Sequence, residues 1–430
     1  MLYQTLSHTL MKAPLLSPSR RTLNNYDIFY AKPSRKTLNK FGKPSTTLII
    51  HNILSLLIIN IYKGKNMHTK LKSRITYIDS LKGIAMCGVV MIHCGGGNLN
   101  SVLGVISHIG NSGVQMFFLL SSYLSLCSYN HYCNNNTPTM RNTCKWVISK
   151  FIALIPLYYF FLIIYCFKIA VSSDPHISIL NILTHITFTH GFFPHYVNSI
   201  IGTEWYLGVL AILYCFIPFL FKHIKSIEET IICFIFCSIF CHCISVLFEQ
   251  LIPINAIDAV VYIRYWSLYC FITQIPVIIL GIAMFYIIDS NMLHRINNPI
   301  LFSYTLLFLS LCLFLGMALE KNKVLGFGSY SLFGIIFLLM VISQSIHPCK
   351  LINNKIFQII GQNTYVIFLL HPLIIYLYDR KITCLGFNEN INFIIKVIFI
   401  LIITLCISIP LKYIIDTPIV NKLHKYFNFL

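Results

Sequence analysis

Charged side chains are scarce in this chain of 430 residues, of which 10% are charged and 57% are hydrophobic. A soluble domain typically carries about 25% charged residues, so this chain lacks the polar side chains that cover a soluble globule. Acidic residues are scarcest, with 13 Asp and Glu against 32 Lys and Arg, a formal net charge of +19. Because the bases lie between apolar runs without a nucleic-acid-binding motif, we expect an integral membrane protein in a lipid bilayer and no nucleic-acid partner.

Apolar stretches of about 20 residues, long enough to cross roughly 30 Å of hydrocarbon, recur along the chain. Backbone groups in lipid must be satisfied within a helix, so the pattern predicts an all-α, polytopic membrane helix bundle. The weaker segment 177–193 is expected to be re-entrant or interfacial. We predict about ten transmembrane helices, at 76–96, 108–128, 147–168, 204–221, 231–250, 267–288, 299–319, 328–347, 358–378 and 392–415.

Loop charges predict the orientation of this bundle. From Met67 onward, fourteen Lys and Arg lie in one set of alternate loops and five in the other. Since basic loops stay on the cytoplasmic side, we expect both termini to be cytoplasmic and the loop 169–203, which has no Lys or Arg, to face outward. The expected location is the bacterial inner (cytoplasmic or plasma) membrane, with several passes across it.

The first 66 residues differ from the rest, with ten Lys and Arg and one acid, Asp27. A second methionine, Met67, directly precedes a basic stretch and the first strong span. We therefore divide the chain into a basic N-terminal extension, 1–66, which is disordered or reflects a mis-assigned start, and a transmembrane domain, 67–430. The 16 cysteines lie mostly inside apolar runs, where a thiol behaves as a small hydrophobe.

The first span carries three ionisable residues, Asp79, Lys82 and His93. Each costs something like 2.5–3.5 kcal/mol on membrane-insertion scales, which makes all three functional candidates. At about 100° per residue they share one stripe of the helix, with Lys82 and His93 roughly 16 Å apart along its axis. An imidazole there is suited to general-base work. The structural alternative is a helix cap, a snorkelling lysine and a hydrogen-bonded histidine.

Five motifs resemble those of the acyltransferase 3 family, in the family's order over roughly 77–372. They are Tyr77-Ile-Asp79-Ser-Leu-Lys82-Gly83-Ile-Ala with His93 after a ten-residue gap, Gly113-Val114-Gln-Met-Phe117-Phe118-Leu-Leu-Ser121, Lys150-Phe-Ile-Ala153-Leu-Ile-Pro156-Leu-Tyr158, His190-Gly-Phe-Phe-Pro194 through Asn198-Ser199 to Trp205, and Gly361-Gln-Asn-Thr364-Tyr365-Val-Ile-Phe-Leu-Leu-His371-Pro372. Members look like membrane O-acyltransferases that modify sugars of surface glycans.

This resemblance implies an O-acetyltransferase with acyl-CoA, expected to be acetyl-CoA, as cytoplasmic donor and no bound cofactor. It implies an extracytoplasmic glycan or glycolipid acceptor and a transmembrane histidine that acts as base or acyl relay. The expected catalytic residues are His93, Asp79 and Lys82, with an ion pair between the last two. Expected donor-binding residues are Lys150, Arg141 and Lys145. Expected acceptor-binding residues are His190, Asn198, Glu204, Trp205, Ser121 and His371.

Three positions depart from the family pattern. Ala153 stands where the family often has the second arginine of a pair, Ser122 replaces a glycine, and Leu210 replaces a common glutamate. These departures fit one alternative, a non-catalytic membrane partner of the same fold. The other alternative is a transporter or flippase of a lipid-linked sugar, although the chain shows no inverted repeat. A metal site on His176, His185, His190 and His195 is a further alternative; we expect none.

Overall fold

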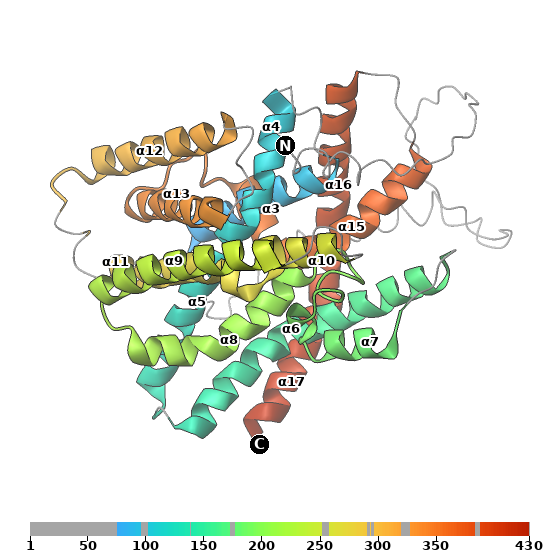
Figure 1. Cartoon of the computed structure of the whole chain (residues 1–430), viewed down its shortest axis with the longest axis horizontal. Helices are drawn as coiled ribbons and strands as arrows, with labels where there is room; N and C mark the ends of the chain where they lie inside the picture. Colours follow the sequence, from blue (N-terminus) through green and yellow to red (C-terminus); the bar gives the residue numbers. More distant parts are fainter. Residues whose placement is uncertain are drawn as a thin grey trace, which may run out of the picture. The chain divides into compact units, whose positions relative to one another are not determined.

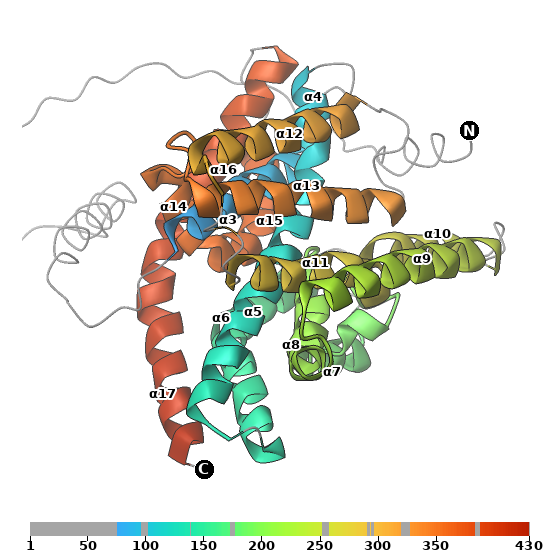
Figure 2. The same cartoon turned by 90° about the vertical axis from the view of Figure 1, so that its left-hand side faces the viewer.

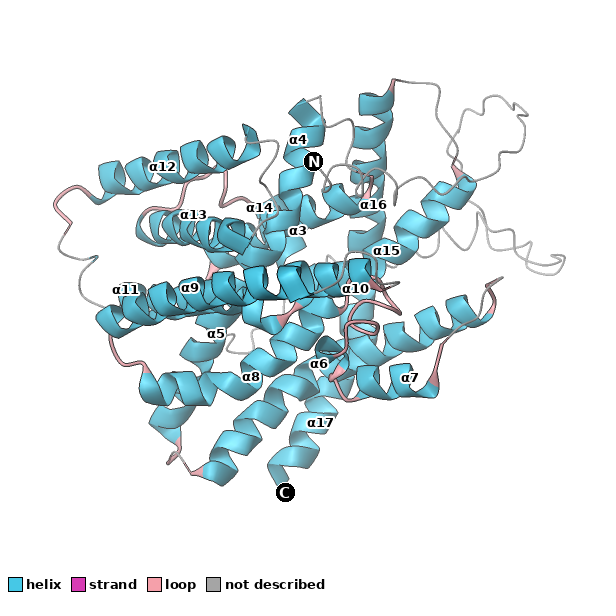
Figure 3. Cartoon of the chain, viewed as in Figure 1, coloured by secondary structure: helices cyan, strands magenta, loops and turns pink. Residues whose placement is uncertain are grey.

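The computed structural model describes residues 75–95, 102–137, 139–172, 177–251, 258–289, 293, 296–319, 327–382 and 388–429. Within these ranges the chain is almost entirely helical and contains no strand (Figure 3). The predicted all-α bundle is therefore confirmed. The predicted N-terminal extension, 1–66, lies outside the described residues, and so does His176.

Figure 1 labels the described helices in chain order. Their bounds are α3 Thr76–His93, α4 Val102–Ile109, α5 Gly113–Asn135, α6 Met140–Ala170, α7 Ile179–Ile186, α8 Trp205–His223, α9 Ile227–Leu251, α10 Ala259–Arg264, α11 Phe271–Asp289, α12 Pro299–Leu319, α13 Phe327–Ile346, α14 Lys355–Gln362, α15 Thr364–Lys381, α16 Glu389–Leu411 and α17 Thr417–Phe429. Short turns separate some of them: η2 Gly110–Ser112, η3 His190–Phe192, and the π-helical turns η4 Tyr265–Tyr269 and η6 Lys412–Asp416.

Every predicted span is helical, although 358–378 is divided between two helices, and not every helix is apolar enough to count as a span on its own. Among the described residues, seven helices are long and apolar enough to cross a membrane, or eight if α14 and α15 form one broken span. The other two predicted spans are α3, which carries three ionisable residues, and α13, whose apolar part is the shorter Tyr330–Ile346. Ten remains the predicted count. The segment 177–193 forms α7 and η3, which are too short to span.

The helix predicted over 358–378 is broken. Helices α14 and α15 meet at Asn363 with a bend of 80°. Helix α14 packs closely on α3: a Cβ atom at Gly361 would lie 1.7 Å from the carbonyl oxygen of Asp79, and one at Gly83 would lie 2.1 Å from that of Phe357. Only glycine allows two backbones to approach this closely. The bend lets α14 lie along α3 while α15 continues beside α16 (Figure 2).

Helix α3 lies at the centre of the described bundle. It packs against α14, α5, α15 and α16, and it is joined through η2 and α4 to the start of α5. On one flank α9 and α11 run side by side, with α12 and α13 next to them (Figure 1). On the other, α17 continues α16 past η6 and lies against α6. The helix that carries Asp79, Lys82 and His93 therefore packs against helices from distant parts of the sequence.

Candidate functional site

Two histidines from opposite ends of the domain meet at the end of α3. The imidazole rings of His93 on α3 and His371 on α15 have centroids 5.0 Å apart and planes inclined by 71°. We call them the histidine pair. The last turn of α3 supplies one ring and the middle of α15 the other. Sequence reasoning chose both residues but not their pairing, because their separation along the chain gives no local signal.

Each ring is fixed by one nitrogen to its own helix. His93 Nδ1 lies 2.7 Å from the carbonyl oxygen of Val89, and His371 Nδ1 lies 3.1 Å from that of Ile367. A carbonyl only accepts, so both Nδ1 atoms donate, and a neutral ring then keeps its lone pair on Nε2. His371 Nε2 is buried and has no hydrogen-bond partner among the described residues. The pair thus offers two potential bases with set tautomers.

The two rings differ in accessibility. The side chain of His93 is exposed, whereas His371 has 0% exposed surface. Of the two rings, His93 is therefore the one with surface open at the edge of the described helices.

Aromatic side chains connect the histidine pair with the start of α8. Phe368 lies 6.0 Å from the ring of His371 and 5.4 Å from that of Tyr206. The Tyr206 hydroxyl lies 3.0 Å from Ser121 Oγ, so Ser121 bonds across to α8. Tyr206 was missed by sequence reasoning, although it directly follows the predicted acceptor residue Trp205.

Trp205 extends this aromatic series toward the loop before α8, residues 187–204. Its ring lies 5.8 Å from Phe118 and 5.3 Å from Tyr269, and Phe118 lies 4.9 Å from Tyr206. Near it, Asn198 donates through Nδ2 to the carbonyl oxygen of Gly202 at 2.6 Å. The other side-chain atom, Asn198 Oδ1, is buried and has no partner among the described residues. The aromatic rings around Trp205 and the unpartnered acceptor Asn198 Oδ1 thus lie together near the start of α8.

The polar start of α3 is anchored to the break between α14 and α15. Asp79 Oδ2 accepts a hydrogen bond from Gln362 Nε2 at 3.2 Å, and Lys412 Nζ donates to the carbonyl oxygen of Gln362 at 2.6 Å. Lys82, one turn further along α3, is half-buried. Gln362 and Lys412 were not foreseen, since contacts across a helix break leave no sequence pattern. The ion pair between Asp79 and Lys82 stays a prediction.

The predicted donor-binding bases occupy the first turns of α6. Lys150 Nζ donates to Ser128 Oγ at 2.7 Å and lies 4.8 Å from the ring centroid of Trp146, whose Nε1 also donates to Ser128 at 3.2 Å. Arg141 is exposed and Lys145 half-buried on the same helix. Positively charged side chains therefore cluster at one end of α6, as binding of phosphate groups requires.

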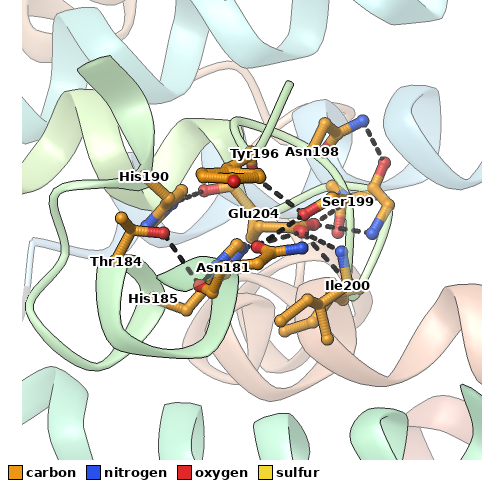
Figure 4. Close-up of polar contacts among 12 residues, drawn as sticks. Asn181, Thr184, His185, His190, Tyr196, Asn198, Ser199, Ile200 and Glu204 are labelled. Carbon is orange, nitrogen blue, oxygen red and sulfur yellow. Dashed lines mark hydrogen bonds and ion pairs between the residues drawn. The ribbon is translucent and has the colours of Figure 1, made fainter. Parts of the chain in front are cut away.

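Glu204 lies at the centre of the polar contacts in the loop before α8 (Figure 4). Its Oε1 atom accepts from the backbone N–H groups of Ile200 and Ile201 at 2.7 and 3.1 Å, and its Oε2 atom from those of Gly202 and Thr203 at 2.6 and 2.9 Å. Gly202 has φ +96°, a conformation that favours glycine. Glu204 has 0% exposed surface, so this placement gives it a role in shaping the loop.

His185, which sequence reasoning did not assign to the site, pairs with this carboxylate. Its Nε2 atom lies 3.3 Å from Glu204 Oε1, and its Nδ1 atom lies 2.8 Å from the carbonyl oxygen of Asn181. A carbonyl oxygen only accepts, so Nδ1 donates to Asn181 and Nε2 faces the carboxylate. Burial alone would raise the pKa of Glu204, but the hydrogen bond and charge of His185 and the backbone N–H groups outweigh it and hold that pKa below its usual value.

His190 stacks on His185, with ring centroids 4.4 Å apart and planes inclined by 10°. Its Nε2 atom lies 3.1 Å from the backbone carbonyl oxygen of Glu204. Burial and then the neighbouring His185 lower the pKa of His190 to about 4. His190 is therefore neutral near pH 7, and the His185 ring lies hydrogen-bonded to the Glu204 carboxylate beside it. The three side chains together fix the loop that precedes α8.

The structure shows the surroundings of the three positions that depart from the family pattern. Ala153 is exposed on α6, so it leaves room but supplies no charge near Lys150. Leu210 is 5% exposed and packs in the core of the bundle. Ser122 donates to the carbonyl oxygen of Ile278 at 2.8 Å, and Gly281 of α11 lies against it. Within the described ranges, no group of three or more His, Cys, Asp or Glu is placed to hold a metal ion.

The apolar helices define the class of this protein, an all-α multi-pass membrane protein. The chain belongs to the acyltransferase 3 family: the family model, described as an acyltransferase domain, matches residues 75–413. This match confirms the resemblance and makes the protein a membrane acyltransferase by family. No curated protein matches the chain.

Proposed function

We propose that this protein is an O-acetyltransferase of the bacterial inner membrane. It moves the acetyl group of cytoplasmic acetyl-CoA to a hydroxyl of an extracytoplasmic glycan or glycoconjugate. The observation that carries the proposal is the histidine pair, in which the exposed His93 ring has its Nδ1 atom fixed on Val89 and its Nε2 atom available as a base. Membership of the acyltransferase 3 family supports transfer of an acyl group.

Donor binding is assigned to bases near the predicted cytoplasmic side. The phosphates of acetyl-CoA need cations, and Arg141, Lys145 and Lys150 of α6 supply them. Lys82 of α3 lies further along the proposed route to the histidine pair. Lys150 donates a hydrogen bond to Ser128, which keeps its ammonium group at one position. Since Ala153 replaces the family's second arginine, Arg141 is the only base of this group that can form a bidentate contact with phosphate.

Acceptor binding is assigned to the loop before α8, which is predicted to face outward, and to the aromatic rings around Trp205. Sugar rings pack on aromatic faces, which Trp205 and Tyr269 offer, and Asn198 Oδ1 can accept from a sugar hydroxyl. Glu204 and His190 hold this loop in its conformation. Ser121 and Tyr206 then lie between the loop and the histidine pair.

The test compares His93→Ala with a matched control, His242→Ala, whose histidine is exposed on α9 away from the site. A deletion strain is complemented with each variant, and O-acetyl groups of the cell-surface glycan are counted by NMR. We expect loss of acetylation with His93→Ala, by about 10²-fold or more, and normal acetylation with His242→Ala. Equal acetylation by both variants would contradict the catalytic assignment and favour a non-catalytic partner or a transporter.

A further inference from the structure

We propose that His371 is a positioning residue that shares the proton taken up by His93 during acyl transfer. This inference rests on the proposed function and assigns His371 to proton handling instead of acceptor binding. It is carried by the 5.0 Å separation of the two rings and by the buried, unpartnered Nε2 atom of His371.

An imidazolium is costly beside the apolar interior of a helix bundle. When His93 removes a proton from a hydroxyl it becomes a cation that faces the buried His371 ring on one side, and surroundings of lower dielectric than water disfavour the charged form. A second imidazole that accepts a hydrogen bond from the new N–H spreads this charge. His371 can do so through Nε2, because its Nδ1 atom already donates to Ile367. Hydrogen bonds of this kind are often long in unliganded enzymes and shorten in the complex.

The proposed transfer balances without a further reactant. The acceptor O–H bond breaks as its proton passes to His93 Nε2, and a C–O ester bond forms as the thioester C–S bond breaks. The thiolate leaves with the electron pair of that bond. The proton shared by the histidine pair then passes to the thiolate, so that both imidazoles end neutral, as they began.

Few other charges face the pair. From α6, Tyr165 donates to the carbonyl oxygen of Leu369, and from α8, Tyr206 bonds to Ser121. Toward the far end of α15, Asp379 and Lys396 of α16 form an ion pair of 2.7 Å and largely offset one another. On α3, Asp79 and Lys82 lie about three turns or more from His93. His371 is therefore the nearest titratable partner of His93 that these contacts reveal.

The first measurement needs no substrate. Purified protein in detergent is treated with diethyl pyrocarbonate, which modifies unprotonated imidazole, and modification of His93 is followed by peptide mass spectrometry from about pH 5 to pH 8. In His371→Phe, which keeps a ring but no acceptor, half-modification of His93 is expected about one pH unit lower than in wild type. His371→Gln keeps an acceptor oxygen and should fall between the two.

The second measurement is acetyl-CoA turnover, followed as release of the free CoA thiol by membranes that contain their own envelope glycan. We expect His371→Phe to lower kcat by about 10²-fold with little change in the KM for acetyl-CoA, and His371→Gln to recover part of the loss. If His371→Phe does not elute as a monodisperse protein, His371→Leu replaces it.

The outcomes separate this inference from the proposed function. An unchanged pH profile and turnover in the Phe variant would overturn the inference. Equal losses in the Phe and Gln variants with an unshifted His93 profile would overturn it too, since packing alone would then explain them. If His93→Ala abolishes turnover while His371→Phe does not, only the inference falls. If neither variant lowers turnover, the proposed function falls as well.

Discussion

Glu204 shows at the residue scale how a buried charge organises a loop. Its carboxylate accepts four backbone N–H groups and pairs with His185. Glu204→Gln replaces one acceptor by a donor that faces these N–H groups. We expect a loss of about 3 kcal/mol in the free energy of unfolding, measured as a lower Tm in detergent. Glu389→Gln, at an exposed position in the first turn of α16, is the control and should leave Tm almost unchanged.

The same loop predicts a pH dependence of stability. Glu204 has a lowered pKa, so its contribution is present above its unfolded value near 4.3 and is lost as pH falls through the folded pKa. His190, with a pKa of about 4 against an ordinary 6.5, also stabilises the fold only when neutral. Tm should therefore fall from about pH 6.5 toward pH 4, by the equivalent of about 3 kcal/mol for His190.

A His190→Asn variant isolates the histidine's share of this effect. Its side-chain amide can still donate toward the backbone of Glu204, but it does not titrate. We expect a shallower decline of Tm between about pH 6.5 and pH 5 than in wild type. Identical declines in both proteins would contradict the assignment of the effect to His190.

At the scale of elements, the contact between α3 and α14 depends on glycine. A Cβ atom at Gly361 would lie 1.7 Å from a backbone oxygen of α3, a contact that no rotamer change relieves. Gly361→Ala should separate the helices, move Asp79 away from Gln362 and lower both Tm and acetyl-CoA turnover strongly. Gly316→Ala on α12, where nothing lies within 4 Å, is the matched control and should be neutral or slightly stabilising. A Gly361→Ala protein with wild-type Tm would refute this account.

The sequence predicted helices better than their junctions. Hydrophobicity over about 20 residues is a local property, so each predicted span is helical. The 80° bend at Asn363 was missed because it depends on α14 lying against α3, a contact between segments far apart in the chain. Polar candidates behaved likewise: helical spacing and a family motif selected His93, and another family motif selected His371, but neither predicted their pairing. Glu204 was expected to meet the acceptor, whereas the structure buries it among backbone donors that no motif reveals.

For the whole molecule, the proposed reaction requires a donor and an acceptor on opposite sides of the membrane. Loop charges predict that the start of α6, with Arg141 and Lys145, is cytoplasmic and that the loop before α8 faces outward. Exposed residues at both places allow this orientation to be tested, namely Cys144 and His195. In an otherwise cysteine-free protein, each position carries the only thiol, as native Cys144 or as His195→Cys.

A membrane-impermeant maleimide applied to intact cells should label His195→Cys and not Cys144, while permeabilised cells should label both. The second condition is the control, because it shows that each thiol is reactive. The reverse pattern would place the bases of α6 outside, where acetyl-CoA is absent, and would be incompatible with the proposed direction of transfer. Labelling of both thiols in intact cells would mean that these two ends of the bundle lie on one side. The route from α6 past Lys82 to the histidine pair would then not cross the membrane.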